Sequence, residues 1–335
     1  KNVVTVGGGT GSPIINRALI ETGEVKYIRA IAAVFDSGGS TGRRRLNSEG
    51  KEPAFSDPMR ILLSLADPRT IGPHYEVIKR WFMHRDTKDA VLGHDIISRF
   101  FDKNNGYTQI EADLKTLGIN LIGTVIPSTT HSTNILFTTQ SGRKYLGEHL
   151  LDGKTMSKDV VVDMKLNPQV PGYLPAIKAI TSADAIFLAC GSPHGSMLCN
   201  FLPLGMRRAI QSTKAKIFVI TNLVSTRNET HEFSPLDYVN LVKKYTGAKI
   251  AGLIVPAMSR RQFEKQYPQV ARLYDLEQSY FLGWTPQQLQ PVISLGVQVI
   301  THRAIKIINV SDEHTKIVRH DSLKLASALK EALNS

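Results

Sequence analysis

The sequence has little cysteine: Cys190 and Cys199 are the only two among 335 residues. Two cysteines are too few for a disulfide framework or a cysteine-ligated zinc site. No apolar run approaches the roughly 20 residues of a membrane-spanning helix, and the first residues show no signal-peptide pattern. These absences exclude a disulfide scaffold and a membrane span, and we expect the protein to be cytoplasmic.

Several signatures of catalysis and nucleic-acid binding are also missing. No Gly-Lys-Ser/Thr completes a P-loop after the first glycine run, and no Gly-x-Ser-x-Gly elbow surrounds a serine. The glycine spacing at residues 7–12 fits a dinucleotide fingerprint poorly, which argues against an NAD-linked oxidoreductase. No zinc-finger or RNP-type motif occurs, so nucleic acid is not the expected partner.

Positive charge, by contrast, is plentiful. Lys and Arg total 41 against 29 acidic residues, which gives a formal net charge of +12. Such a balance favours an anionic partner, although a basic surface can also serve solubility alone. The only tight basic run is the arginine triplet at 43–45, which directly follows a glycine-rich segment. That placement favours a small phosphate ligand.

The order of apolar runs predicts an α/β fold. Residues 2–6 and 28–35 are apolar strands separated by a helix at 13–20, with Ser12 as its expected N-cap and Pro13 at its first position. Strand, glycine turn, helix and strand make a βαβ unit. Further strands are expected at 121–127, 133–138, 144–146, 185–189, 216–221, 249–255 and 305–310. Further helices are expected at 57–66, 174–182, 196–211, 235–245 and 322–333.

We therefore expect a doubly wound, mostly parallel, Rossmann-like sheet with an inserted antiparallel and helical region at about 68–170. No repeat or low-complexity linker divides the chain, so residues 1–335 are expected to form a single domain.

The first glycine run lies between a strand and a helix. Glycines there permit positive φ angles and let a ligand approach the backbone closely, and the free N–H groups of the following helix favour an anion. A tight turn that needs glycine only for packing is the alternative. The residues expected to bind phosphate are Gly8, Gly9, Thr10, Gly11 and Ser12.

The second glycine-rich segment follows the second strand, at the sheet edge where open parallel sheets bind ligands. It combines backbone donors, hydroxyls and a guanidinium, which together suit a phosphate group. The residues expected to take part are Gly38, Gly39, Ser40, Thr41 and Arg43.

Asp36 and Asp57 are the carboxylates nearest these two segments in the sequence. Either can hold Mg²⁺ against phosphate oxygens or activate a hydroxyl, but Asp57 can equally be a helix cap. Arg60, one turn further on, can face the ligand or solvent. His94 can contact phosphate or act as an acid or base, or it can be a buried structural residue. Asp36, Asp57 and His94 are thus candidate catalytic residues, and the two aspartates are candidate metal ligands.

A third glycine turn follows the strand at 185–189. Its position at a strand end predicts ligand contacts from Gly191, Ser192 and His194. Cys190 lies in the same turn, where we interpret it as a small residue filling a tight space rather than a nucleophile.

These segments, in this order, resemble the CofD-like family, which includes 2-phospho-L-lactate transferase and the YvcK-type gluconeogenesis factors that bind UDP-sugars. The family's Gly-Gly-Gly-Thr-Gly matches residues 7–11, and its Asp-Asp-Gly-Gly-Ser-Ser-Gly-Arg matches residues 36–43, with Ser37 replacing the second Asp. Its Gly-His-x-x-Gly-Asn matches residues 93–98, where Ile97 and Ser98 replace Gly-Asn. Its Asn…Glu-Thr segment matches Asn222 and residues 229–230. The YvcK branch is the more similar.

The resemblance implies a ligand lying across the strand ends, with phosphates near residues 7–12 and 191–192 and further contacts from Asn222 and Glu229. It implies a regulatory protein that binds a nucleotide or nucleotide-sugar of the UDP-sugar type. The alternative is a Mg²⁺-dependent transferase similar to 2-phospho-L-lactate transferase, and the question of turnover stays open at this point. We also expect a homo-oligomer, with a dimer as the favoured form.

Overall fold

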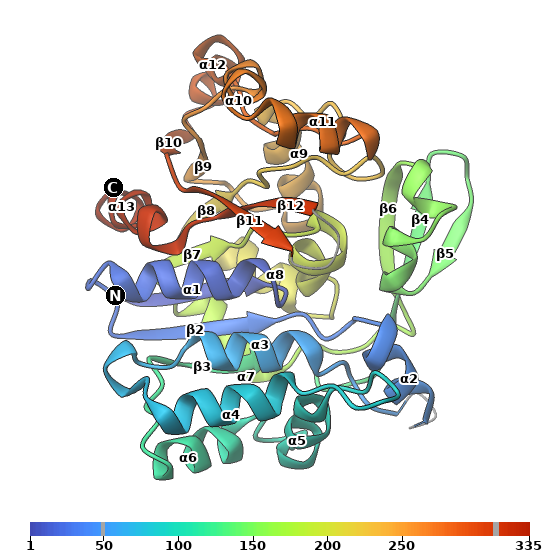
Figure 1. The fold of residues 1–335 in the computed structure, drawn as a ribbon, viewed down its shortest axis with the longest axis vertical. Helices are drawn as coiled ribbons and strands as arrows, with labels where there is room; N and C mark the ends of the chain where they lie inside the picture. The colour runs from blue at the N-terminus through green and yellow to red at the C-terminus, as the bar shows by residue number, and fades with distance from the viewer. Residues whose placement is uncertain (48–50, 311–314) are drawn as a thin grey trace.

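The computed structural model describes residues 1–47, 51–310 and 315–335. Its central sheet has seven parallel strands in the order β10-β9-β8-β7-β1-β2-β3 (Figure 1). The strand order runs outward from β1 in both directions, so it reverses between β1 and β7. This confirms the predicted doubly wound, Rossmann-like sheet. The strands are β1 (Asn2–Gly7), β2 (Tyr27–Ala32), β3 (Gly123–Pro127), β7 (Ala185–Leu188), β8 (Lys216–Ile220), β9 (Gly252–Pro256) and β10 (Gln298–His302).

Helices cover both faces of the central sheet, and its strands are therefore apolar nearly throughout. Neighbouring residues of β1 point to opposite faces, so that Val3 packs in one core and Val4 in the other, both fully buried. The core that contains Val3 is closed by α1 (Gly11–Glu21), α3 (Ser56–Ser64) and α13 (Ser322–Asn334). The core that contains Val4 is closed by α7 (Leu174–Thr181), α8 (Met206–Ser212) and α9 (Pro235–Thr246).

Two insertions interrupt the sheet. Between β2 and β3 the chain forms helices, and after β3 it forms a separate antiparallel sheet of order β5-β4-β6, which projects from the body in Figure 1. The predicted antiparallel and helical insertion is thus confirmed. The predicted range of about 68–170 contains α4 (Pro73–Met83), α5 (Leu92–Phe100), α6 (Thr108–Thr116), β4 (Asn134–Thr139), β5 (Lys144–Leu146) and β6 (Val161–Asn167), and α2 (Gly39–Asn47) precedes it.

An antiparallel hairpin joins the central sheet to the closing helix. It consists of β11 (Ile305–Val310) and β12 (Thr315–His320), and it lies against α11 (Pro268–Leu276), where the Val318 N–H donates to the Tyr274 hydroxyl at 2.9 Å. The predicted strand at 305–310 is confirmed, whereas β12 was not predicted. The remaining helices are α10 (Arg260–Gln266) and α12 (Pro286–Ser294). No helix in the described ranges is long and apolar enough to cross a membrane.

Three local predictions were wrong. The helix expected at 196–211 is broken into a wide turn at Pro193–Met197, a tight turn at Leu198–Phe201 and α8, because Pro203 lacks an N–H and Gly205 has φ +91°. No helix was expected at residues 39–47, which form α2. Ser12 is not an N-cap, since α1 begins at Gly11 and the Ser12 N–H already donates to the Gly8 carbonyl at 3.2 Å.

Gly11→Ala tests the contact that fixes the start of α1. A Cβ on Gly11 would lie 1.4 Å from the Cys190 carbonyl oxygen, so the two backbones must move apart. We expect the free energy of unfolding, measured by urea denaturation, to fall by about 1–3 kcal/mol or more. Gly72→Ala is the matched control, because nothing lies within 4 Å of its Cβ position and its φ of −154° suits alanine. Equal losses in the two variants would contradict this reading.

Candidate functional site

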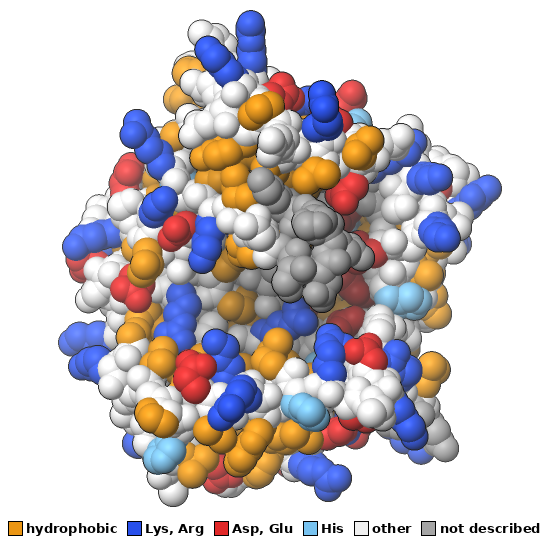
Figure 2. All heavy atoms as spheres, viewed as in Figure 1, with side chains coloured by type: hydrophobic (Ala, Val, Ile, Leu, Met, Phe, Trp, Pro, Cys, Tyr) orange, Lys and Arg blue, Asp and Glu red, His pale blue; other side chains and the backbone are white. Residues whose placement is uncertain are grey.

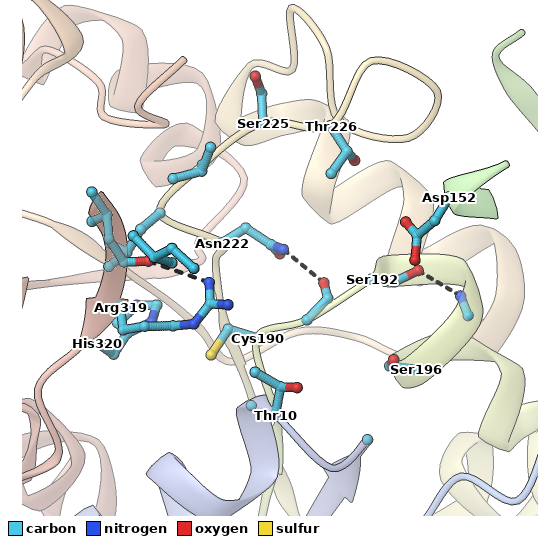
Figure 3. A pocket seen from close by; sticks show the side chains of 18 of the residues that line it. Thr10, Asp152, Cys190, Ser192, Ser196, Asn222, Ser225, Thr226, Arg319 and His320 are labelled. Atoms are coloured by element: carbon cyan, nitrogen blue, oxygen red, sulfur yellow. Dashed lines mark hydrogen bonds between the residues drawn. The ribbon is translucent and has the colours of Figure 1, made fainter. Parts of the chain in front are cut away.

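A cavity of about 630 Å³ opens at the carboxyl ends of β1, β7 and β8 (Figure 3). Its walls include residues 8–11 after β1, 190–192 after β7 and 222–226 after β8, and residues 317–320 of β12 complete it. It therefore lies where the strand order reverses, which is the usual ligand position in a doubly wound sheet.

The glycines of the first loop serve close packing rather than unusual backbone angles. None of the glycines at 7–11, all of which lie in the described part of the chain, has a positive φ, so that expectation was wrong. Added Cβ atoms would instead collide with neighbours: at Gly8 with the Ser196 Cβ at 2.8 Å, and at Gly9 with the Asp57 Oδ1 at 2.6 Å. These glycines thus allow close packing that brings three separate segments of the chain together, and phosphate binding at this loop stays a prediction.

The start of α1 faces the cavity. Thr10 precedes the helix, makes no side-chain capping bond, is exposed, and lies on the cavity wall in Figure 3. The start of this eleven-residue helix carries partial positive charge and favours an anion, although Pro13 has no N–H and the Ser12 N–H donates to the Gly8 carbonyl. Ser12 differs from its neighbours, because it is fully buried, and its Oγ would lie 2.6 Å from a Cβ on Gly7.

Besides the exposed Glu277, four carboxyl side chains line the cavity, and the first two lie beside the first glycine loop: Asp36, Asp57, Glu148 and Asp152. Figure 2 shows acidic side chains along the side of the central hollow that faces the β4–β6 sheet. Burial, followed by the charge of Asp36, raises the pKa of Asp57 to about 7. Burial and the same neighbouring carboxylates raise the pKa of Glu148 to about 9. Burial and the charge of Glu229 also raise the pKa of Asp152. Arg60, which lowers the pKa of Asp57, offsets this effect only in part.

Asp57 does not cap α3, because Phe55 occupies the N-cap position. It instead accepts a hydrogen bond from the Gly9 N–H, which lowers its pKa only in part. Asp36 accepts from the Gly38 N–H at 2.9 Å and from the Ser56 hydroxyl at 2.6 Å. These bonds hold the two aspartates beside the first glycine loop.

The two aspartates fit a magnesium ion only if the ligand shares it. Within the ranges that the structure describes, no group of three or more His, Cys, Asp or Glu side chains could hold a metal ion. Mg²⁺ is commonly bound by one or two carboxylates together with substrate phosphates and water. Asp36 and Asp57, both on the cavity wall, could supply those carboxylates.

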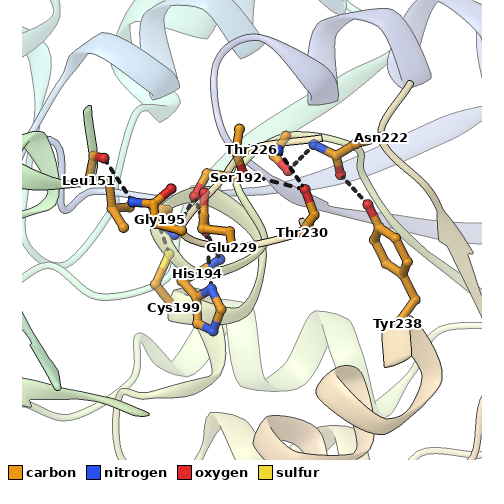
Figure 4. A network of polar contacts seen from close by, with 12 residues as sticks. Leu151, Ser192, His194, Gly195, Cys199, Asn222, Thr226, Glu229, Thr230 and Tyr238 are labelled. Atoms are coloured by element: carbon orange, nitrogen blue, oxygen red, sulfur yellow. Dashed lines mark hydrogen bonds and ion pairs between the residues drawn. The ribbon is translucent and has the colours of Figure 1, made fainter. Parts of the chain in front are cut away.

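A buried polar network supports the third loop (Figure 4). Glu229 Oε1 accepts from the Ser192 hydroxyl at 2.7 Å and from the His194 N–H at 3.0 Å, and it lies 3.1 Å from His194 Nδ1. Asn222 Nδ2 donates to the Gly191 carbonyl at 2.7 Å. Ser192, Gly191 and Asn222 line the cavity, whereas His194 and Glu229 are buried behind it.

The second glycine-rich segment largely lies elsewhere. Ser40, Arg43 and His94 surround a separate cavity of about 430 Å³. Arg43 forms an exposed ion pair with Asp89 at 3.3 Å, and the Ser40 hydroxyl accepts from the Val91 N–H at 3.0 Å. Burial lowers the pKa of His94 to about 4, so this histidine is neutral at pH 7. Gly38, Gly39 and Thr41 belong to the lining of neither cavity.

The residues that depart from the family motifs have partners within the protein. Ser37 Oγ lies 2.8 Å from His149 Nδ1 and also accepts from the His149 N–H at 3.3 Å. Ser98 accepts from the Arg44 guanidinium at 2.6 Å. Ile97 is fully buried in the core that contains Val3. These substitutions are therefore accommodated by local packing.

Two cations lie close to the cavity of about 630 Å³, which we call the main cavity. Arg60 is exposed on α3, and its Cδ would lie 3.0 Å from a Cβ on Gly9. Arg319 extends from β12 toward Cys190 and Thr10 in Figure 3, and its Nη1 donates to the Val318 carbonyl at 3.4 Å. The guanidinium that reaches the main cavity is thus that of Arg319, not that of Arg43.

Sequence reasoning missed Arg319, Glu148 and Asp152. Glu148 and Asp152 lie in a short turn (Glu148–Asp152) after β5 that carries no recognisable motif. Arg319 begins an Arg-His-Asp triplet just before the closing helix, which is visible in the sequence. Nothing in the sequence linked that triplet to the strand ends, because the β11–β12 hairpin was only half predicted.

The fold and the cavity define a doubly wound α/β protein with a ligand cavity at the reversal of its strand order. Residues 3–314 match the family model described as 2-phospho-L-lactate transferase CofD, and the chain belongs to this family. The predicted family resemblance is thereby confirmed.

Similar proteins bear gluconeogenesis-factor names. A protein of Aquifex aeolicus named "Putative gluconeogenesis factor" is 30% identical, and the match covers 100% of this chain and 97% of that protein. The "Gluconeogenesis factor" of Listeria monocytogenes is 29% identical over 73% of this chain and 74% of its own length. These names support a YvcK-like protein. A crystal structure of a Bacillus halodurans protein of the UPF0052 family shares the fold, with a TM-score of 0.79 at 23% identity and coverage of 97% of this chain and 98% of that one.

Glu148→Gln tests whether the charged form of the buried Glu148 carboxyl destabilises the folded protein. An acid whose pKa is raised in the folded state binds more protons when folded, so its contribution to stability falls as pH rises from about 4.5 to about 9. We expect the variant to raise the melting temperature of the ligand-free protein by at least about 2 °C at pH 8, and by less at pH 5. Glu277→Gln, an exposed carboxyl on the same cavity, is the control. A gain in melting temperature of equal size at pH 5 and pH 8 would contradict the raised pKa of Glu148.

Proposed function

We propose that the protein binds a nucleotide-linked phosphate ligand of the UDP-sugar type in the main cavity, and that it acts as a YvcK-like regulator of metabolism or of the cell envelope. The observation that carries the proposal is the convergence of the start of α1 and the Arg319 guanidinium on one cavity at the reversal of strand order.

The chemistry of that convergence suits a diphosphate. Backbone N–H groups at a helix start bind phosphate oxygens, and a guanidinium donates several hydrogen bonds in a planar arrangement that matches a phosphate. The exposed hydroxyl of Thr10 adds a further donor on the same wall. The net charge of +12 favours the approach of an anion.

The rest of the cavity suits the remainder of such a ligand. Its volume of about 630 Å³ falls within the roughly 300–1,000 Å³ of small-molecule sites. Asn222 and Thr226, after β8, offer polar groups to a base or ribose. The gluconeogenesis-factor names of the relatives support regulation rather than turnover.

Arg319→Ala tests this proposal directly. Loss of a charge-assisted hydrogen bond of about 1.5–3 kcal/mol should raise the Kd for UDP-glucose by about 10-fold or more, measured by isothermal titration calorimetry. Arg43→Ala is the matched control. Because Arg43 lies outside the main cavity, in an exposed pair with Asp89, that variant should change the Kd less than about twofold. A larger effect at Arg43 than at Arg319 would move the phosphate site to the smaller cavity.

The alternative function is a Mg²⁺-dependent transfer of a phosphate-containing group, similar to that of 2-phospho-L-lactate transferase. It is favoured by Asp57, whose pKa of about 7 suits a group that takes up a proton from an attacking hydroxyl. Mg²⁺ held by Asp36 and Asp57 would neutralise the ligand's phosphates. A transferase consumes its nucleotide-activated donor and a sensor does not, so release of free nucleotide would distinguish the two functions. The homo-oligomer and the cytoplasmic location stay predictions.

A further inference from the structure

The hydroxyl of Ser192 has a fixed hydrogen-bonding direction. It donates its single proton to Glu229 Oε1 at 2.7 Å and accepts from the Gly195 N–H at 2.8 Å. A hydroxyl has one proton and two acceptor lone pairs, so one lone pair is left. Because Ser192 lines the main cavity, it can offer a ligand only an acceptor.

Glu229 and His194 hold the hydroxyl in this state. Glu229 is 5% exposed and His194 is 1% exposed, so both are shielded from bulk water. The same Oε1 that accepts from Ser192 also accepts from the His194 N–H at 3.0 Å. An oxygen that accepts these bonds has no proton of its own to return to Ser192. The contacts of Glu229 therefore fix the direction of the hydrogen bond between the Ser192 hydroxyl and Glu229.

The cavity wall beside Ser192 carries the carboxyl groups of Asp152 and Glu148. Asp152 lies beside Ser192 in Figure 3, and both interact with Glu229. Glu148 lies close to the same turn, since its Oε1 would be 2.9 Å from a Cβ on Gly195, but its raised pKa of about 9 leaves it protonated and uncharged at pH 7. A phosphate group here would face the Ser192 lone pair and the Asp152 carboxyl group, whereas the donors Thr10 and Arg319 lie elsewhere in the cavity. We call the wall at Ser192 and Asp152 the acceptor side, and the wall at Thr10 and Arg319, which Asp57 borders through its bond with the Gly9 N–H, the donor side.

We propose that Ser192 accepts a hydrogen bond from a hydroxyl of the ligand's sugar, so that the acceptor side of the cavity selects the sugar while the phosphates lie at the donor side. This inference rests on the proposed binding of a UDP-sugar. It gives Ser192 a contact with sugar instead of phosphate, and it makes Glu229 and His194 positioning residues that do not touch the ligand.

The test compares UDP with UDP-glucose in calorimetric titrations of the whole chain. The Kd for UDP divided by the Kd for UDP-glucose measures what the sugar contributes to binding. Ser192→Ala should reduce that ratio by about 3- to 10-fold, the equivalent of one neutral hydrogen bond, and should leave the Kd for UDP within about twofold of wild type. If Ser192 contacts phosphate, both affinities fall together and the ratio is unchanged, which overturns the inference while the proposed function stands.

Two Glu229 variants test the positioning role. Glu229→Gln keeps an acceptor oxygen for the Ser192 proton, so the ratio should stay within about twofold of wild type. Glu229→Ala frees that proton and should lower the ratio as Ser192→Ala does, although Glu229 does not line the cavity. Glu229→Gln serves as the folded reference if the alanine variant fails to fold. An unchanged ratio in a folded Glu229→Ala variant would refute the positioning role, and wild-type protein that binds neither UDP nor UDP-glucose would remove the proposed function and this inference with it.

Discussion

The candidate site depends on one backbone contact, between the start of α1 and the turn after β7. A Cβ on Gly11 would lie 1.4 Å from the Cys190 carbonyl oxygen, so only glycine allows the two segments to touch. Gly8 and Gly9 extend the contact to Ser196 and Asp57 in the same way. Through this packing, the N–H groups of α1, the Ser192 turn and the carboxylates beside β2 surround a single cavity. The glycines therefore act by bringing polar groups together.

The same packing gathers acidic side chains in the wall of the cavity. Burial and mutual repulsion raise the pKa of Glu148 to about 9 and that of Asp57 to about 7. Such groups reduce the stability of the ligand-free protein, and functional sites often carry a cost of this kind. A ligand that brings hydroxyl donors, or a cation shared with its phosphates, would relieve it. Arg319 comes from a different element, the β11–β12 hairpin, and supplies the opposite charge on the donor side.

The sequence predicted the sheet and much of the cavity wall because these depend on local patterns. Apolar runs followed by glycine turns mark the ends of parallel strands, and those ends meet at one edge of the sheet. Gly8, Gly9, Asp36, Gly191 and Asn222 all line the cavity for this reason.

The positions of the other site residues could not be predicted, because they depend on tertiary packing and not on local sequence patterns. The second glycine-rich segment begins a helix, and a Cβ on Gly42 would lie 2.2 Å from the Ser37 carbonyl oxygen. This tight turn leaves Arg43 on the smaller cavity, paired with Asp89, a residue far from it in sequence. Arg319 reaches the main cavity only through the hairpin. A sequence shows which residues follow a strand, but not the direction that the next helix takes.

The most direct test of the account is a thermal-shift comparison of UDP-glucose, GDP, GTP and NAD(H), each with and without Mg²⁺. A ligand that binds only the folded state raises the melting temperature by mass action. The account predicts a shift with UDP-glucose that does not require Mg²⁺. A shift confined to a guanine nucleotide with Mg²⁺ would support the transferase instead, and no shift with any of these compounds would contradict the assignment of the cavity to a nucleotide-linked phosphate ligand.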